Sequence, residues 1–412
     1  MLKIAMLSTG EEVLHGDIVD TNAAWLAERF FAEGFPLTKR ATVGDNQSDL
    51  IRELVQLSHV HQIVIVNGGL GPTSDDLSAE AAALASGDAL RLFPEWLEQM
   101  KAFFAQRHIE MPSSNIKQAM LPESATIVDN PIGTACGFSL RINQCLFYFT
   151  PGVPSEFKLM IDQQILPDLK RRYPQQMGLA CHRFYTFGAS ESALSEVLDK
   201  VQLPTGYQLG YRAYLPFIEV KVFSPQGDPH CQRMLTIIAS LIETYTVSVD
   251  MPLIDHLAQQ LAQAQLSLAT SEQSSAGQLA RDLQSHSILR QWHHQGWVLS
   301  PAIRHNEQAL QEPLAAVLAL AGATRMQCKT DLALVTGAVH EQQVTLALAT
   351  PQGEWGQQLR FRRPYREEEQ QILLSTLALD MLRRYLLNKP MFAQYGSVER
   401  VSEQFIPASR LG

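Results

Sequence analysis

The apolar positions of residues 1–170 alternate between short strand-like runs and segments with helical spacing. The runs KIAMLS, LTKRATVG and QIVIVNGG each precede such a segment, namely DTNAAWLAERFFAEGF, SDLIRELVQLSHV and SAEAAALASG. A β-branched run such as QIVIVNGG is typical of a strand buried on both faces of a parallel sheet. This repeated order predicts an open α/β sheet, in which ligands bind beyond the carboxyl ends of the strands.

The pattern changes twice along the rest of the chain. Residues 171–250 run strand, helix, hairpin-like pair, helix and strand, which predicts a small α+β module. Residues 251–390 have an amphipathic helix at each end and the strand-like runs LSLAT, DLALVTGAV and QQVTLALAT between them, which predicts a second α/β domain. Residues 391–412 are mixed and polar, and we expect a loosely ordered tail there.

The composition fits a soluble globular protein with several domains. The 412 residues are 46% hydrophobic and 18% charged, with no apolar run long enough to cross a membrane. The N-terminus MLKIAMLSTGEE turns acidic too early for a signal peptide, so we expect a cytoplasmic protein with no membrane partner. A formal charge of −9 argues against nucleic acid as the main partner but allows a small phosphorylated ligand. The five cysteines are scattered without a CxxC pair, which predicts reduced packing residues.

The strongest candidate for chemistry is NGGLGPTSDDLSAEA, at positions 67–81, between a predicted buried strand and a helix. Gly68, Gly69 and Gly71 allow the backbone to approach a ligand, and successive N–H groups there can bind phosphate. Asp75 and Asp76 follow, and two carboxylates beside a phosphate cradle can hold a divalent cation. The alternative is that both aspartates only cap the helix.

Acidic residues and glycines also follow the other predicted strands of residues 1–170. The segments are STGEEVLHGDIVDTN, VGDN, NPIGTACGF and FTPGVPSEF. Any one of them is more typical of a turn than of a ligand site. Together, at one edge of one sheet, they predict a shared site.

These motifs, in this order, resemble the CinA (competence-damage-inducible) family over about 170 residues. The resemblance implies a molybdopterin-binding-type domain at 1–170, a KH-type module at 171–250 and a deamidase-like domain at 251–390. Cys136 stands where the family usually has proline. The middle segment contains YTFGASES but no GxxG loop, so no nucleic-acid binding is expected from it.

The resemblance further implies a metal-dependent pyrophosphatase that acts on ADP-ribose, a small-molecule nucleotide, in a homodimer. The expected cofactor is cobalt or magnesium, with potassium as a further candidate. Asp45 and Asp76 are the expected catalytic residues, and Asp75, Asp76 and Glu156 the expected metal ligands. The expected substrate-binding residues are Gly68, Gly69, Gly71, Thr73, Asn22, Gly152 and Pro154. The open alternative is a non-catalytic protein that binds a molybdopterin-like or nucleotide ligand at the same glycines.

The family ends in a nicotinamide-nucleotide (NMN) deamidase domain whose nucleophile is the serine of AESCTGG. Here the matching segment is SEQSSAG, in which Glu272 and Gly277 match and Gln273 replaces the nucleophile. Neighbouring serines cannot inherit the role, because a shift of one residue moves and turns the side chain.

The deamidase's other functional groups are altered as well. The family's YSNEAK becomes LSPAIR, so Leu299 replaces the tyrosine and Arg304, which stays protonated, replaces the lysine. The glycine-rich loop is reduced to TGAVHEQQ. We therefore predict a retained fold without deamidase activity, which serves for interaction, dimerisation or weak nucleotide binding.

His293 and His294 form an adjacent pair that could suggest a metal site. Adjacent side chains point in different directions on regular structure, and no third ligand lies nearby in the sequence. We expect a solvated loop instead.

Overall fold

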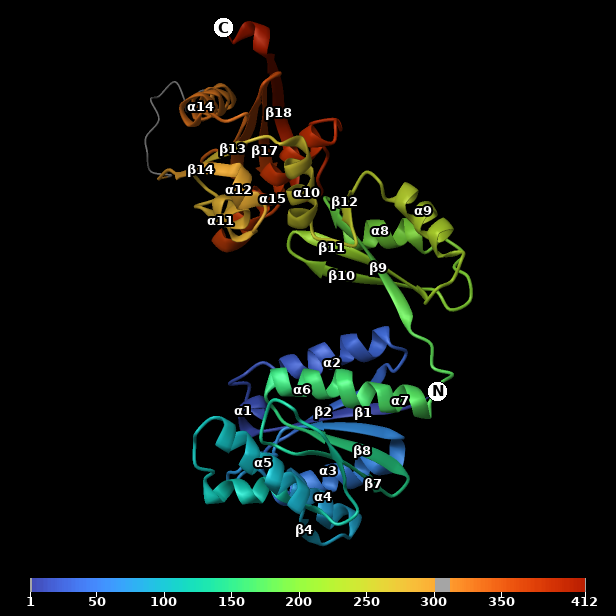
Figure 1. The fold of residues 1–412 in the computed structure, drawn as a ribbon. Coiled ribbons are helices and arrows are strands. Elements are labelled where there is room, and N and C mark those ends of the chain that lie inside the picture. The colour runs from blue at the N-terminus through green and yellow to red at the C-terminus, as the bar shows by residue number, and fades with distance from the viewer. Residues whose placement is uncertain (1, 301–311, 412) are drawn as a thin grey trace. The chain divides into compact units, whose positions relative to one another are not determined.

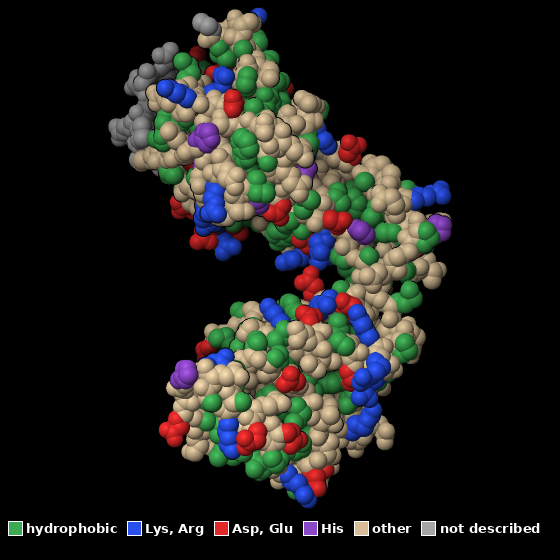
Figure 2. Space-filling model, viewed as in Figure 1, with side chains coloured by type: hydrophobic (Ala, Val, Ile, Leu, Met, Phe, Trp, Pro, Cys, Tyr) green, Lys and Arg blue, Asp and Glu red, His purple; other side chains and the backbone are tan. Residues whose placement is uncertain are grey.

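The computed structural model describes residues 2–300 and 312–411 of the chain. The chain forms two compact units, Met1–Ala180 and Cys181–Gly412. Figure 1 shows that each unit is built from mixed α/β layers. Charged side chains of both signs are interspersed on the displayed surface of each unit (Figure 2). Among the described residues, no helix is long and apolar enough to cross a membrane.

The first unit contains a six-stranded sheet in the order β2-β1-β3-β8-β7-β6. Strands β2, β1, β3 and β8 are parallel, whereas β7 and β6 are antiparallel additions. A separate two-stranded sheet pairs β4 with β5. The elements are β1 (Ile4–Thr9), α1 (Glu11–Leu14), α2 (Thr21–Ala32), β2 (Leu37–Val43), α3 (Gln47–Val60), β3 (Ile63–Asn67), α4 (Ser78–Ser86), β4 (Leu90–Leu92), α5 (Pro94–Gln106), η1 (Ser113–Ala119), β5 (Met120–Pro122), β6 (Thr126–Val128), β7 (Gly137–Ile142), β8 (Cys145–Thr150), α6 (Pro154–Met160), η2 (Ile161–Ile165) and α7 (Leu166–Arg172).

Helices cover both faces of this sheet, as Figure 1 shows. Every residue of β1, β3 and β8 is buried, which agrees with the continuous apolar runs in the sequence. Helices α3, α4 and α5 pack on one face, and α2 with α6 and α7 on the other. The open α/β sheet predicted from the sequence is therefore confirmed. The four parallel strands end at Thr9, Val43, Asn67 and Thr150, so the loops that follow them meet at one edge.

The second unit begins with a four-stranded sheet in the order β10-β11-β9-β12. Its elements are β9 (Leu179–Phe187), α8 (Glu191–Leu198), β10 (Gln208–Tyr214), β11 (Phe217–Pro225), α9 (Cys231–Leu241) and β12 (Thr246–Val249). Apolar residues of α8 and α9 pack with those of β9 and β11 in one cluster. This arrangement matches the α+β pattern that the sequence predicts for residues 171–250.

The rest of the second unit is a six-stranded sheet in the order β14-β13-β15-β16-β17-β18. Strands β14, β13 and β15 are parallel and the other pairings are antiparallel. The elements are α10 (Leu253–Ala264), β13 (Leu268–Glu272), α11 (Gln278–Ser285), α12 (Leu289–Trp292), β14 (His293–Val298), α14 (Pro313–Cys328), β15 (Leu332–Thr336), β16 (Gln343–Thr350), β17 (Gly353–Phe361), α15 (Glu367–Leu386), β18 (Val398–Pro407) and η3 (Ala408–Arg410).

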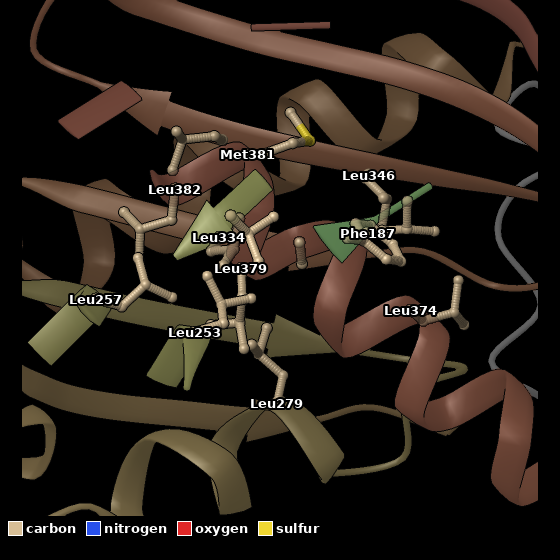
Figure 3. Packing of buried hydrophobic residues seen from close by; sticks show 14 of the residues in the cluster. Phe187, Leu253, Leu257, Leu279, Leu334, Leu346, Leu374, Leu379, Met381 and Leu382 are labelled. Atoms are coloured by element: carbon tan, nitrogen blue, oxygen red, sulfur yellow. The ribbon is translucent and has the colours of Figure 1, made fainter. Parts of the chain in front are cut away.

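The larger core of this sheet lies beneath α10, α11 and α15 and is mostly aliphatic. Figure 3 shows Leu257, Leu279 and Met381 from helices near Leu334 and Leu346 from strands. Phe187 of β9 belongs to the same cluster, so the four-stranded sheet shares a hydrophobic core with the six-stranded one.

The expectation of a loosely ordered tail at 391–412 is wrong. Strand β18 pairs with β17 along its whole length, from Val398 opposite Phe361 to Pro407 opposite Gly353. Only alternate side chains of a strand at a sheet edge face the protein, so its sequence looks polar. The periodicity of VERVSEQFIP is therefore too weak to separate an edge strand from a tail.

Candidate functional site

The loops after the parallel strands of the first unit enclose a cavity of about 510 Å³. Its wall includes residues from the β1, β2, β3 and β8 loops and from the segment before β7. The sequence-predicted site residues in its lining are Asn22, Asp45, Gly68, Gly69, Gly71, Asp75, Asp76, Gly152, Pro154 and Glu156. Thr73 is outside the lining but contacts Asp76. The fold thus brings the predicted residues together around one cavity.

Asp45 is held in the lining of this cavity by a reciprocal pair of hydrogen bonds with Glu11. Its carboxylate accepts from the backbone N–H of Glu11 at 3.2 Å, and its own N–H donates to Glu11 Oε1 at 3.1 Å. Burial, together with the nearby carboxylates of Glu12 and Asp75, raises the pKa of Asp45. Like charges disfavour ionisation, so this part of the site favours a cation or a proton.

Asp75 and Asp76 do not cap the following helix. Helix α4 begins at Ser78, and no side chain caps its N-terminus. The Asp76 carboxylate instead accepts from the backbone N–H of Thr73 at 2.9 Å and from the Thr73 hydroxyl. The hydrogen bond from Thr73 is also the largest contribution that lowers the pKa of Asp75, so that carboxyl is ionised at neutral pH. Both carboxylates remain available at the cavity wall.

Asn22 and Asn67 form a buried link beneath the glycine loop. Asn22 Nδ2 donates to Asn67 Oδ1 at 3.0 Å and to the carbonyl of Gly152 at 2.8 Å. Asn67 Nδ2 in turn donates to the carbonyl of Pro151 at 2.7 Å. The link ties the β1, β3 and β8 loops together. Asn67 is a site residue that the sequence reasoning missed, although a polar residue at the end of an otherwise apolar strand is a usable signal.

Glu156 is oriented by a third buried asparagine, Asn130. Asn130 Nδ2 donates to Glu156 Oε2 at 2.8 Å and to the carbonyl of Ala135 at 3.0 Å. Asn130 precedes the GTACGF motif, so the start of this segment positions the Glu156 carboxylate in the cavity lining. The sequence alone assigns no role to Asn130.

Several glycines of the motifs lie directly against carboxylates. A Cβ added to Gly71 would lie 2.8 Å from Cγ of Asp76, and one on Gly44 would lie 2.7 Å from Cδ of Glu11. A Cβ on Gly133 would lie 2.6 Å from Glu156 Oε1. Ordinary van der Waals contact begins near 3.4 Å, so these glycines leave room for the acids as well as for a ligand.

The donors of this cavity suit a metal that binds together with phosphate. Within residues 2–300 and 312–411, no group of three or more His, Cys, Asp or Glu side chains is close enough to hold an ion. Magnesium-type sites commonly use one or two carboxylates and complete their coordination with substrate phosphate and water. Asp45, Asp75, Asp76 and Glu156 offer carboxylates of that kind around the cavity.

The second unit has a cavity of about 340 Å³ at the carboxyl ends of β13 and β15, and Gln273 and Gly337 are in its lining. Gln273 directly follows β13, at the corner that leads into α11. The neighbouring hydroxyls have other partners: Ser275 Oγ donates to Glu272 Oε2 at 2.7 Å, and Ser274 Oγ accepts from the N–H of Val339 at 2.7 Å. Ser275 is also completely buried, and neither serine is part of the lining of this cavity.

Glu272 is completely buried and forms the structural centre of this corner. Its carboxylate accepts from the N–H groups of Gly277, Leu279 and Ala280 at 3.1, 3.0 and 2.7 Å. A negative charge at the start of a helix is favourable, and here it satisfies three N–H groups that have no partner within the helix. Leu299 lies beside this corner, where its N–H donates to the carbonyl of Glu272 at 2.7 Å. Arg304 lies outside the described residues.

The expectation of a solvated loop at His293 is wrong. His293 begins β14 and is buried, with Nε2 2.9 Å from the hydroxyl of Thr270 and Nδ1 2.8 Å from Gln284 Nε2. Burial lowers its pKa to about 4. A buried neutral histidine with both ring nitrogens engaged is a core residue. His294 is exposed on the same strand.

Comparison with known proteins agrees with this architecture. Residues 5–171 match the family described as "Probable molybdopterin binding domain". A "CinA-like protein" of Escherichia coli (strain SMS-3-5 / SECEC) is 42% identical over 404 residues, which cover 97% of this chain and 98% of the relative. The "NMN amidohydrolase-like protein YfaY" of Escherichia coli (strain K12) is similar to the same extent, with 42% identity and the same coverage.

A solved structure of the protein CinA, of unknown function, from Thermoplasma acidophilum is 27% identical. It covers 41% of this chain and 96% of its own length, with a TM-score of 0.37. The E. coli relatives match almost from end to end at a level of identity that establishes common descent. This chain belongs to the family of CinA-like proteins.

Proposed function

We propose that the first unit hydrolyses the diphosphate of ADP-ribose or a related nucleotide with the help of a divalent cation, cobalt or magnesium. The observation that carries this proposal is the shared cavity, in which a glycine loop and carboxylates from several strand ends face one space. Glycine backbone N–H groups bind phosphate oxygens, and carboxylates hold cations or accept protons.

Each group of residues in the cavity has its own proposed role in this reaction. The loop at Gly68, Gly69 and Gly71 holds the diphosphate, and Asp76 lies beside it. The pKa of Asp45 is raised whereas that of Asp75 is lowered, so Asp45 is the better proton acceptor of the two for an attacking water. Asp75, Asp76 and Glu156 would hold a divalent cation bound together with the substrate, which would neutralise phosphate charge and lower the pKa of water. The water oxygen attacks one phosphorus, the P–O bond of the bridge breaks, and AMP and ribose 5-phosphate leave.

The test is formation of AMP and ribose 5-phosphate from ADP-ribose with added Co²⁺ or Mg²⁺, with and without K⁺. We expect Asp45→Ala and Asp76→Ala each to reduce turnover at least a hundredfold. Asp49→Ala is the control, because that carboxylate is exposed on α3 and pairs with Arg52. Full activity of both cavity variants would refute the assignment.

A second candidate is binding without catalysis, favoured by the match of residues 5–171 to a probable molybdopterin binding domain. In that case the cavity holds a molybdopterin-like or nucleotide ligand without turnover. Saturable binding of ADP-ribose with no product in the presence of any divalent cation would favour this function over hydrolysis.

For the second unit we propose that NMN deamidation has been lost. Gln273 cannot act as a nucleophile, and Ser274 and Ser275 already form hydrogen bonds within the corner. Purified protein should release ammonia from NMN no faster than buffer does, and clear turnover would overturn this proposal. We also propose a homodimer, which light scattering on the purified protein would test.

A further inference from the structure

The short helix η1 contacts the loop after β3 through two side chains. Gln118 Nε2 donates to the carbonyl of Leu70 at 3.1 Å, and Lys117 Nζ donates to the carbonyl of Thr73 at 2.7 Å. Gln118 is buried, and Asn115 orients its amide by donating to Oε1 at 2.8 Å. These two contacts hold the part of the loop that lies between the first glycines and the aspartates.

Thr73 connects Lys117 to the Asp76 carboxylate. The Thr73 carbonyl accepts from Lys117 Nζ and also from the backbone N–H of Asp76 at 3.4 Å, which closes the turn 73–76. The N–H and the hydroxyl of Thr73 both donate to the Asp76 carboxylate. The position of this carboxylate therefore depends on Thr73, and the position of Thr73 depends on the ammonium group of Lys117.

Packing does not hold the turn 73–76 in place. No residue from Gly71 to Leu77 is buried, and the segment lies between the end of β3 and the start of α4. A segment with few buried contacts opens easily unless other interactions restrain it. A hydrogen bond from an ammonium group is charge-assisted and stronger than one between neutral groups. The bond from Lys117 is thus a main restraint on this turn.

Lys117 is placed to act on the turn and not on a ligand in the cavity. Its side chain is 28% exposed, and it is not part of the lining of the 510 Å³ cavity. Its Nζ lies 3.8 Å from Oε1 of Glu80, an ion pair that holds the ammonium beside α4. Any effect of Lys117 on a reaction in the cavity therefore passes through Thr73.

We infer that Lys117 is a positioning residue that keeps the Asp76 carboxylate at the cavity by fixing the turn 73–76. This inference rests on the proposed function, in which Asp76 acts beside the bound diphosphate. Removal of the ammonium group frees the Thr73 carbonyl, so the turn and the carboxylate shift together.

The glycines proposed to hold the diphosphate have restraints of their own. Gly68 N–H donates to the carbonyl of Thr150 at 2.9 Å, and the carbonyl of Gly69 accepts from the N–H of Ser78 at 3.0 Å. Neither bond involves Lys117. Loss of the Lys117 ammonium should therefore slow the reaction and leave substrate binding unchanged.

The experiment measures kcat and KM for ADP-ribose with the full chain at saturating Co²⁺ or Mg²⁺. Lys117→Met keeps the aliphatic stem and removes the ammonium, whereas Lys117→Arg keeps a charged donor. Lys101→Met is the matched control, because Lys101 is 51% exposed on α5, pairs with Glu98 at 2.7 Å and is outside the cavity lining.

Lys117→Met should lower kcat about tenfold, because a displacement of about 1 Å can lower a rate about a hundredfold and a smaller one costs less. KM should stay within about twofold of the wild-type value. Lys117→Arg should restore most of kcat, and Lys101→Met should match the wild type. The melting temperature should not change in any variant, since both lysines are partly exposed.

A double-mutant cycle with Asp76→Ala shows whether Lys117 acts through that carboxylate. If it does, Lys117→Met has no further effect on kcat once the Asp76 side chain is gone. An equal fall in kcat with and without this side chain contradicts the inference, because Lys117 would then act elsewhere.

The remaining outcomes separate the inference from the proposed function. If the wild type turns over ADP-ribose and Lys117→Met has the same kcat, the inference is wrong while the proposed function survives. A higher KM with unchanged kcat also refutes it, because Lys117 would then bind the substrate phosphates directly. Failure of Lys117→Arg to restore kcat, or a lower melting temperature of Lys117→Met, assigns Lys117 to the stability of the fold instead. Absence of turnover by the wild type overturns the proposed function and the inference together.

Discussion

Gly71→Ala tests whether the glycine loop positions a carboxylate as well as a phosphate. The backbone at Gly71 does not have positive φ, so alanine is tolerated there. The new Cβ would lie 2.8 Å from Cγ of Asp76 and closer still to Oδ2, and contact begins near 3.4 Å, so the carboxylate must move by at least about 0.6 Å. That movement weakens the hydrogen bond between Asp76 and the N–H of Thr73.

The expected consequence is a loss of activity without a loss of fold. Displacements approaching 1 Å can lower rates about a hundredfold, so we expect kcat/KM for ADP-ribose to fall between about tenfold and a hundredfold. The melting temperature should change little, since Asp75 and Asp76 lie in a surface loop.

A double-mutant cycle with Asp76→Ala separates the two roles of the glycine. If Gly71 acts by leaving room for Asp76, then Gly71→Ala has no further effect once that carboxylate is gone. If Gly71→Ala lowers kcat/KM by the same factor with and without the Asp76 side chain, the reasoning is refuted. The glycine would then act directly on the diphosphate.

Three further predictions concern the second unit. Asp380 is buried and accepts hydrogen bonds at 2.7–2.8 Å from Arg383, Arg384 and Tyr395. Asp380→Ala should lower the free energy of unfolding in urea by about 3–5 kcal/mol, because it leaves buried arginine charge unpaired. Burial lowers the pKa of His293 from 6.5 to about 4, so its contribution to the free energy of unfolding is fully present above pH 6.5 and is lost as the pH falls toward 4. About 3 kcal/mol of stability should disappear over that range, and His293→Gln should flatten the dependence of stability on pH. Gln273→Ser alone should not produce measurable ammonia release from NMN, because Leu299 supplies no base.

The parallel sheet and the position of the first site could be predicted because both depend on local patterns. A short, continuously apolar run such as IVIV fits few structures other than a buried strand. The loops that follow parallel strands must then meet at one edge of the sheet. The grouping of Asp45, Asp75 and Glu156 around one cavity then follows from the order of the strands. No local pattern could reveal that Gly71, Gly44 and Gly133 make room for carboxylates, because that depends on how the loops pack.

The errors have a common physical cause. The sequences of strand β18 and around His293 are polar. Local polarity of this kind favours a disordered tail at 391–412 and a solvated loop at His293. In the folded chain, long-range contacts decide their state: β18 pairs with β17, and His293 bonds to Thr270 of the neighbouring strand. Tertiary structure overrides local polarity where a partner satisfies the polar groups.

The corner at Glu272 shows why only part of the deamidase motif persists. Glu272 caps α11 through three N–H groups, and Gly277 has a φ of +90°, a conformation that glycine adopts without strain. The hydroxyl of Thr336 lies 2.5 Å from that of Ser275. The motif positions that match the family therefore maintain the fold.

The positions that differ are those that catalysis alone would require. Gln273 stands where the resemblance places the nucleophile, and Leu299 donates its backbone N–H to the carbonyl of Glu272 at this corner. A domain that lost its activity but kept its fold should retain the structural motif positions and change the catalytic ones, as seen here. A domain with an altered but active site would instead need a new nucleophile and a new base in the cavity. Ser274 and Ser275, the nearest hydroxyls, both have structural partners, so the corner stabilises the fold and the chemistry is to be sought in the first unit.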